Sequence, residues 1–228
     1  MHVVVIGGQT RAIGKTSVMA GLIRAVKPPG TPETSGTMGT NPGGREGGWT
    51  AVKVTPYAHG SGSHDGEPCA PGAPPFTLTE ERDAAGRGDT CRFLAAGARR
   101  ALWLRVGQGQ LAPAWPALRE ALRGEEWVMM ESNSIVEFLA PDLYLMVIDG
   151  ARPDFKTSAQ RFFDRADALV AVGSGLPELQ EKTWPEVTLT GARRPPVFPV
   201  NPRDYSSPEL VEFVTRKLRA IGELTIDD

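Results

Sequence analysis

Apolar residues in this chain alternate between short unbroken runs and helical spacing, a pattern typical of α/β proteins. The run Val3 to Ile6 predicts a buried strand, and apolar residues three to four positions apart predict a helix over Ser17 to Val26. The glycine-bearing segment Gly7 to Thr16 lies between them. The chain therefore opens with a predicted strand, a loop and a helix that packs on a sheet.

The same alternation continues along the rest of the chain. It favours a mostly parallel sheet with helices on both faces, and we expect a three-layer α/β fold. Predicted strands are Trp49 to Val54, Ala101 to Val106, Trp127 to Met130, Leu143 to Ile148, Ala168 to Val172 and Val197 to Val200. Predicted helices begin near Asp89 and span Ala114 to Arg123, Ser134 to Leu139, Thr157 to Arg165 and Pro208 to Ile221.

Two segments rich in glycine and proline flank the strand predicted at Trp49 to Val54. Lys27 to Gly48 and Thr55 to Pro75 carry too few large apolar residues to offset the entropy of ordering them. We expect flexible insertions near 27–48 and 55–75. Because a doubly covered sheet can absorb this length in one core, residues 1–228 are predicted to form a single domain.

Charge and cysteine content indicate which partners and which cellular compartment to expect. A formal net charge of -2 offers no general attraction for nucleic acid or anionic lipid, so we expect neither as a partner. Cys69 and Cys91 are too few for a disulfide framework, and no basic leader or apolar span precedes the first strand. These features favour the cytoplasm.

The loop before the first helix has the residues of a phosphate site. Gly14, Lys15 and Thr16 stand at the helix start, where backbone N–H groups and the helix dipole attract phosphate. Lys15 is expected to contact the phosphates and Thr16 to hold Mg²⁺. Gly8 stands one position earlier than the usual P-loop spacing requires. The alternative is a chance tripeptide at an ordinary helix start, but the strand before it and the helix after it favour a P-loop NTPase fold.

Further loop residues refine this site. Arg11 and Ser17 are candidates for nucleotide contacts, although an exposed arginine would explain Arg11 equally well. ATPases that dimerise around nucleotide, such as ParA and MinD, have a lysine where this chain has Thr10. That difference argues against a switch of their kind.

Two families share motifs with this chain. The longer spacing from Gly8 to Gly14 is similar to that of the dethiobiotin synthetases. The segment Gly88 to Ala98 resembles Gly-Lys-Asp-Ser/Thr-x-Arg-His-x-x-Ala-Gly-Ala of the molybdopterin-guanine dinucleotide biosynthesis protein B (MobB) family. Thr50 to Lys53 and Val128 to Glu131 resemble two strands of that family, in the same order.

The MobB resemblance implies a GTP-binding protein with weak hydrolysis, which assists a partner protein in molybdenum cofactor biosynthesis and forms a homodimer. Val54, Phe93 and Ser132 depart from the family pattern, since they replace two histidines and a glycine. The Asn-Lys-x-Asp signature that reads guanine is absent from the sequence. GTP or ATP therefore both remain candidate ligands, with Mg²⁺ as cofactor.

The remaining candidates for the nucleotide and metal site are polar residues at the ends of predicted strands and helices. Glu131 ends a strand at the edge where parallel sheets bind ligands, so it could organise Mg²⁺ or the attacking water, or simply pair with a nearby helix. Lys53 could bind the γ-phosphate or a substrate anion, or remain solvated. Asp89 and Arg92 could contact the ligand or form an intrahelical ion pair. Asn133 follows Glu131 and could belong to the same site, or cap the helix that follows it.

Three functions are consistent with these features. The leading one is a Mg²⁺-dependent nucleotide-binding adaptor in cofactor biosynthesis, a weak NTPase in which Lys15 and Glu131 are catalytic. The second is an ATP-dependent ligase or kinase acting on a small carboxylic acid, similar to dethiobiotin synthetase. The third is a nucleotide-gated interaction protein. Another metal site could be drawn from His59, His64, Asp65 and Cys69, although their spacing follows no known ligand pattern.

Overall fold

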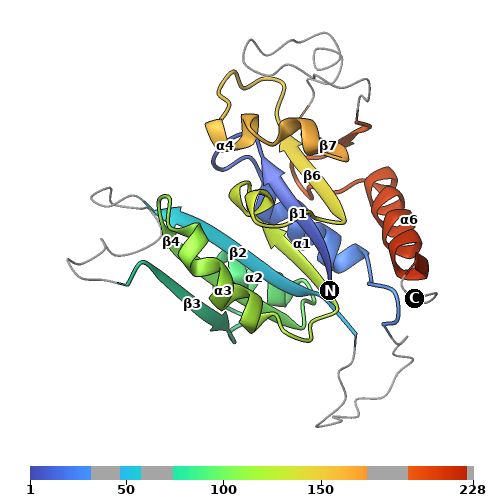
Figure 1. The fold of residues 1–228 in the computed structure, drawn as a ribbon. Helices are drawn as coiled ribbons and strands as arrows, with labels where there is room; N and C mark the ends of the chain where they lie inside the picture. Colours follow the sequence, from blue (N-terminus) through green and yellow to red (C-terminus); the bar gives the residue numbers. More distant parts are fainter. Residues whose placement is uncertain (32–46, 58–73, 174–194, 225–228) are drawn as a thin grey trace.

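The computed structural model describes residues 1–31, 47–57, 74–173 and 195–224. Its strands join one eight-stranded sheet in the order β3-β4-β2-β5-β1-β6-β7-β8 (Figure 1). The strands are β1 (His2–Gly8), β2 (Thr50–Tyr57), β3 (Phe76–Glu81), β4 (Arg100–Gly107), β5 (Trp127–Glu131), β6 (Leu143–Ile148), β7 (Ala168–Val172) and β8 (Val197–Val200).

All neighbouring strands in this sheet are parallel except β3, which runs antiparallel to β4. The central strand β1 lies between β5 and β6, with Ile6 opposite Glu131 and Gly8 opposite Val147. Because these strands end at one edge, the loops that follow them meet above β1.

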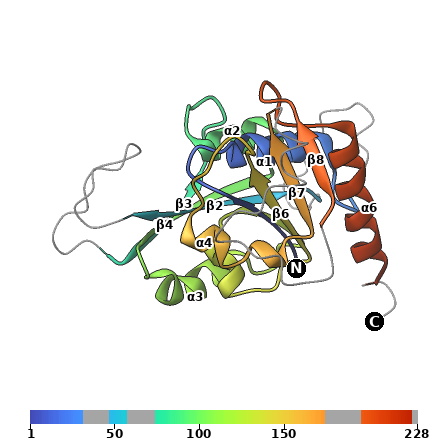
Figure 2. The same ribbon diagram turned by 90° about the horizontal axis from the view of Figure 1, so that it is seen from above.

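Helices cover both faces of the sheet (Figure 2). One core contains side chains of α1 (Lys15–Ala25), α2 (Asp89–Ala95) and α6 (Pro208–Leu224) against alternate strand positions such as Val4 and Ile6. The opposite core contains α3 (Leu111–Ala121), the 3-10 turn η1 (Ser134–Glu137), α4 (Thr157–Gln160) and η2 (Phe163–Arg165). The expectation of a three-layer α/β fold with a mostly parallel sheet is confirmed.

Several predicted boundaries were wrong. Thr55 to Tyr57 were expected to begin a flexible stretch, but they belong to β2 and pair with β4. The edge strand β3 was not predicted at all. The helix expected over Thr157 to Arg165 is broken into α4 and η2. Most of the two expected insertions, residues 32–46 and 58–73, lies outside the described residues. Among the described residues, no helix has the length and apolarity to cross a membrane.

Candidate nucleotide-binding site

The loop from β1 to α1 has a backbone shape that depends on glycine. Gly14 directly precedes α1 with φ 96° and ψ 10°, in the left-handed region that glycine adopts without steric cost. A Cβ atom on Gly8 would lie 2.7 Å from Cγ of Lys15 and from Cγ2 of Ile13. Glycine at this position therefore leaves room for the stem of Lys15 to cross the loop.

Two polar side chains hold the start of the loop. Asn133, which follows β5, accepts a hydrogen bond from Gly8 N at 2.7 Å and donates one to Gly8 O at 2.8 Å. Gln9 is fully buried and donates to the carbonyl oxygens of Arg152 and Asp154, while its own amide oxygen accepts from Asp149 N. The loop shape is thus set by residues from distant parts of the chain.

Lys15 is folded back over this loop. Its Nζ donates to Thr10 O at 3.2 Å. Burial lowers the pKa of Lys15, and the positive charges of Lys53 and Arg11 lower it further, against the opposing effect of Glu131 and Asp89. An ammonium in such surroundings gains from an anionic ligand, because phosphate oxygens would replace the missing hydration.

A second group of side chains meets beside the first turn of α1. Thr16 Oγ1 donates to Glu131 Oε2 at 2.7 Å within the protein interior. Lys53 Nζ lies 3.0 Å from Glu131 Oε1 and 3.4 Å from Thr16 Oγ1, and it also pairs with Asp89. Thr16 and Glu131 lie 115 residues apart in the sequence, so this group joins distant parts of the chain.

Charge is balanced within this group. Burial lowers the pKa of Lys53, but the negative charges of Glu131 and Asp89 outweigh it, so the pKa is raised overall. Lys53 is therefore a partly buried, ion-paired cation, with 16 % of its side chain exposed, and the alternative of a solvated lysine is wrong. Glu131 is 5 % exposed and bonded on both oxygens, by Thr16 of α1 and by Lys53, so it does pair with a nearby helix, as its alternative interpretation expected.

Asp89 connects α2 to β2, and Arg92 connects it to α1. Arg92 donates from Nη2 to Ser17 Oγ at 2.8 Å, and its Nη1 lies 3.6 Å from Asp89 Oδ1. The simple interpretation of an ion pair within the helix is confirmed. The pair also has contacts outside its helix, because Asp89 reaches Lys53 and Arg92 reaches Ser17.

The oxygens around Lys53 are suited to Mg²⁺. Thr16, Glu131 and Asp89 offer one hydroxyl and two carboxylates, and all three contact a single cation, the Lys53 ammonium. Hard oxygen donors are the ligands that Mg²⁺ prefers, together with phosphate oxygens and water. Among the described residues, no group of three or more His, Cys, Asp or Glu side chains could hold a metal alone. The candidates His59, His64, Asp65 and Cys69 include no residue that the structure describes.

Comparisons with known proteins were made for sequence and structure. No family model matches this sequence. No curated protein matches it either. Among solved structures, the nickel complex of HypB from Helicobacter pylori has a TM-score of 0.47 and 13% identity over 96% of this chain and 88% of that one. The ATP complex of LpxK from Aquifex aeolicus has a TM-score of 0.39 and 15% identity over 87% of this chain and 53% of that one.

These similarities are too weak to transfer a function. The fold assignment rests instead on the parallel sheet and on the glycine loop between β1 and α1. In this fold, ligands bind at the carboxyl ends of the strands, where the loop lies.

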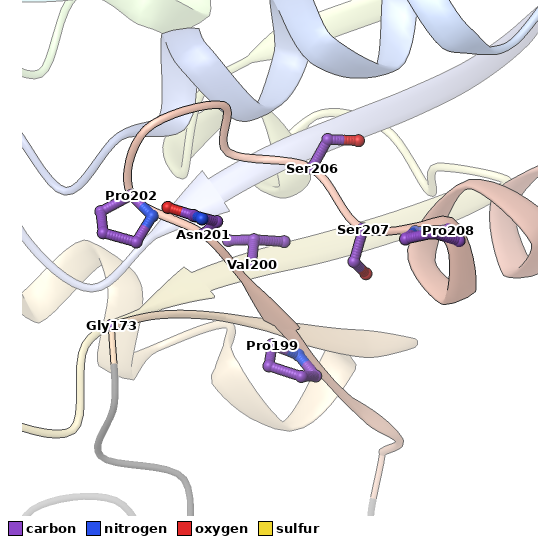
Figure 3. Close-up of a pocket in the computed structure, with 8 residues that line it drawn as sticks. All are labelled: Gly173, Pro199, Val200, Asn201, Pro202, Ser206, Ser207 and Pro208. Atoms are coloured by element: carbon purple, nitrogen blue, oxygen red, sulfur yellow. The ribbon is translucent and has the colours of Figure 1, made fainter.

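One cavity at this edge lies beside the loop. It has a volume of about 550 Å³ and is formed where β7 and β8 end (Figure 3). Pro199, Val200 and Pro202 give it apolar walls, while Asn201 and Ser206 add polar groups. Tyr205 connects the cavity to the loop, because a Cβ atom on Gly14 would lie 2.7 Å from its Cδ1 atom.

A second cavity lies on the other face of the sheet, between η1 and α4. Its volume is about 400 Å³, and its lining includes Ser134, Lys156 and Ser158. Asn133, whose side chain holds the loop, also donates to Ser158 Oγ at 3.5 Å. This cavity therefore adjoins the loop from the side opposite α1.

The structure brings most of the predicted site residues together. Gly8, Gly14, Lys15, Thr16, Ser17, Lys53, Asp89, Arg92 and Glu131 form one continuous set of contacts and neighbours. Arg11 belongs to the loop and is exposed, and its positive charge acts on Lys15. Whether any of these residues binds ligand stays a prediction.

Three residues of the site were missed or assigned another role. Asn133 was expected either to belong to the site or to cap the following helix; its side chain makes no cap hydrogen bond and bonds Gly8. Gln9 and Lys156 were not singled out. Gln9 is an ordinary loop residue by type, and Lys156 lies in an irregular segment far along the chain. Their positions depend on the contact between β1 and the loop after β6.

Proposed function

We propose that this protein binds a nucleoside triphosphate with Mg²⁺, hydrolyses it slowly, and acts as an adaptor in the biosynthesis of the molybdenum cofactor or a related cofactor. The observation that carries the nucleotide part is the contact of Thr16 with Glu131 and Lys53 directly after a glycine loop. The role in cofactor biosynthesis rests on the resemblance of Gly88 to Ala98 to the MobB family.

In this proposal the loop amides and Lys15 hold the β- and γ-phosphates. Thr16, Glu131 and Asp89 hold Mg²⁺, which neutralises charge on the phosphates when bound. Glu131 is suited to orient a water molecule toward the terminal phosphate, because its carboxylate lies at the end of β5 next to Thr16. Lys53 compensates the carboxylates until Mg²⁺ is bound.

The base is assigned to the cavity where β7 and β8 end. Its volume of about 550 Å³ and its mixture of proline, valine and polar side chains suit a flat heterocycle. Tyr205, on the loop that borders this cavity, packs at Gly14, next to the residues that would hold the phosphates. An Asn201→Ala variant should therefore change the ratio of GTP affinity to ATP affinity. It should change the Mg²⁺ dependence of nucleotide affinity less.

An ATP-dependent ligase or kinase is the second candidate. The observation that favours it is the cavity of about 400 Å³ next to the loop, on the face opposite α1. A small acidic substrate there would be close to Lys156. An adaptor should turn over slowly with nucleotide alone, whereas a ligase should consume ATP rapidly when its acid is supplied.

The proposal is tested by calorimetric titration of GTP and ATP, each with Mg²⁺, into the wild type and into Lys15→Ala. Wild-type binding that the variant loses supports the phosphate site. The matched control is Lys27→Ala, which removes an exposed lysine after the far end of α1 and should leave the affinity unchanged. Absence of binding to the wild type would disprove nucleotide binding as the function.

A further inference from the structure

We infer that Lys156 is an additional cation of the phosphate site, which contacts the terminal phosphate of a bound triphosphate from the loop after β6. The inference rests on the proposed nucleotide binding and deepens it by naming the residue that distinguishes triphosphate from diphosphate. It concerns a residue outside the glycine loop and outside the group around Lys53.

The loop after β6 is fastened to the glycine loop at several points. Lys156 N donates to Gln9 O at 2.9 Å, and Thr10 Oγ1 donates to Asp154 Oδ2 at 2.5 Å. Gln9 donates from its side chain to two carbonyl oxygens of the same segment. These bonds fix the backbone of Lys156 against the start of the glycine loop, so its side chain departs from a defined position.

The side chain of Lys156 is half-buried and has no anionic partner among the residues that the structure describes. Burial, followed by the positive charges of Lys15 and Arg11, lowers the pKa of Lys156 to about 8. The loop and its neighbour thus carry three cations that act on one another, since the backbone of Lys156 is bonded to Gln9. A bound polyphosphate would supply negative charge and offset the repulsion among these three cations.

The terminal phosphate is the expected contact for two reasons. Lys15, the charge that most affects Lys156, is the residue that reaches the β- and γ-phosphates in a glycine loop of this kind. The base is assigned to the β7–β8 cavity, whereas Lys156 lines the cavity between η1 and α4. Lys156 thus approaches the loop from another side than the nucleoside.

The test compares a slowly hydrolysed imido triphosphate with the matching diphosphate, each as its Mg²⁺ complex, by calorimetry. In Lys156→Gln, triphosphate affinity should fall about tenfold, as expected for a lost charged hydrogen bond, while diphosphate affinity changes less than twofold. Lys156→Arg should keep triphosphate affinity within about threefold of the wild type, because it keeps the charge. Lys27→Gln is the control for loss of a lysine elsewhere.

Proton uptake gives an independent readout. With a pKa near 8, about half of the Lys156 side chains are neutral at pH 8, so triphosphate binding should take up to about half a proton per site. Titrations in buffers of different ionisation enthalpy measure this uptake, which Lys156→Arg should reduce. The neighbouring charged groups stay constant in that comparison: Arg11 and Lys15, whose charges act on Lys156, Glu137 and Arg161, which line the same cavity, and Asp149, Arg152 and Asp154 in the same loop after β6.

The outcomes separate this inference from the proposed function. If the wild type binds nucleotide but Lys156→Gln keeps full triphosphate affinity, Lys156 serves only the cavity that it lines and the inference is overturned. An equal loss for triphosphate and diphosphate overturns it as well. If Lys156→Gln fails to fold, Lys156→Arg decides through proton uptake, since unchanged uptake would exclude Lys156 as the group that titrates. Failure of the wild type to bind either nucleotide refutes the proposed function itself.

Discussion

The ammonium of Lys53 lies 3.0 Å from Oε1 of Glu131, on the carboxylate whose other oxygen accepts a hydrogen bond from Thr16 at 2.7 Å. One lysine thus stands among the oxygens that are suited to Mg²⁺. The Lys53 ammonium and Mg²⁺ would contact the same carboxylates. The effect of Mg²⁺ on the stability of the protein should therefore depend on whether Lys53 is present.

Replacing Lys53 by methionine should destabilise the free protein and make it responsive to Mg²⁺. The change leaves Glu131 without its cation and Asp89 with Arg92 alone, and a broken buried ion pair typically costs about 3 kcal/mol of unfolding free energy. Millimolar Mg²⁺ should restore part of this loss, because the divalent ion can neutralise both carboxylates. Urea unfolding with and without Mg²⁺ measures both effects.

Lys27→Met is the control for this experiment, since it changes an exposed lysine in the same way. Equal stability of Lys53→Met and the wild type would show that the ion pairs contribute nothing. A Mg²⁺ response as large in the wild type as in Lys53→Met would contradict a shared site.

Substituting Gly14 with alanine should abolish nucleotide binding. The new Cβ would meet the ring of Tyr205, and the backbone φ of 96° would be strained for any residue with a side chain. The double variant Gly14→Ala with Tyr205→Ala should recover stability only in part, because it removes the clash and leaves the strain. Thermal unfolding and nucleotide titration report these two effects.

Gly109→Ala is a control that shows the cost of backbone strain without a steric clash. Gly109 also has a positive φ, 78°, but a Cβ atom there would meet nothing within 4 Å. We expect a cost of about 1 kcal/mol from the backbone alone and no effect on nucleotide affinity. Tolerance of Gly14→Ala equal to that of Gly109→Ala would show that contact with Tyr205 does not matter.

Asn133 should affect nucleotide binding through the loop rather than through the ligand. Asn133→Ala leaves the N–H and C=O groups of Gly8 without their side-chain partner, at a cost of about 1–3 kcal/mol. Asn133→Asp keeps the acceptor for Gly8 N but loses the donor, so its unfolding free energy should lie between those of the wild type and Asn133→Ala. Chemical denaturation orders the three proteins.

The ligand measurement on these variants has a different expected order. Asn133→Asp adds a negative charge beside the proposed phosphate site, so its nucleotide affinity should be lower than that of Asn133→Ala. Ser134→Ala, one position further along, serves as the control. Full nucleotide affinity in both Asn133 variants would show that the loop keeps its shape without this side chain.

Glu81 should contribute stability that depends on pH. Hydrogen bonds from Asp83 N, Cys91 and Thr90 lower the pKa of Glu81 from 4.5 to about 2 in the folded protein. A lowered folded pKa stabilises the protein above pH 4.5, and this contribution is lost as the pH falls toward 2. The difference in unfolding free energy between the wild type and Glu81→Gln should therefore shrink over that interval.

Urea unfolding at several pH values measures this difference, and Glu212→Gln on the exposed side of α6 provides the background. Since Glu81 holds the start of α2, which includes Asp89, its loss should also weaken the effect of Mg²⁺ on nucleotide binding. A stability difference that stays constant from pH 5 to pH 2 would rule out the lowered pKa.

The buried strands were the most predictable part of the fold. The predicted limits of β6 and β7 agree with the structure, because unbroken apolar runs are required wherever both faces of a parallel sheet are covered. The limits of the edge strand β8 agree as well, although it is only partly buried. The strand β3 was missed since its residues alternate with threonine and glutamate at the exposed sheet edge. Its pairing with β4 stabilises it, and such a partner is not visible in a local pattern.

The sequence by itself determined the glycine loop, with Lys15 and Thr16 at the start of α1, because a strand, a turn and a helix start are local features of the chain. Only the tertiary structure decided that Glu131 and Lys53 contact Thr16, that Asn133 holds Gly8, and that Lys156 is bonded to the loop at Gln9. Parallel strands bring residues from distant positions to one edge of the sheet. The partners that they find there depend on strand order and register, which are long-range properties of the folded chain.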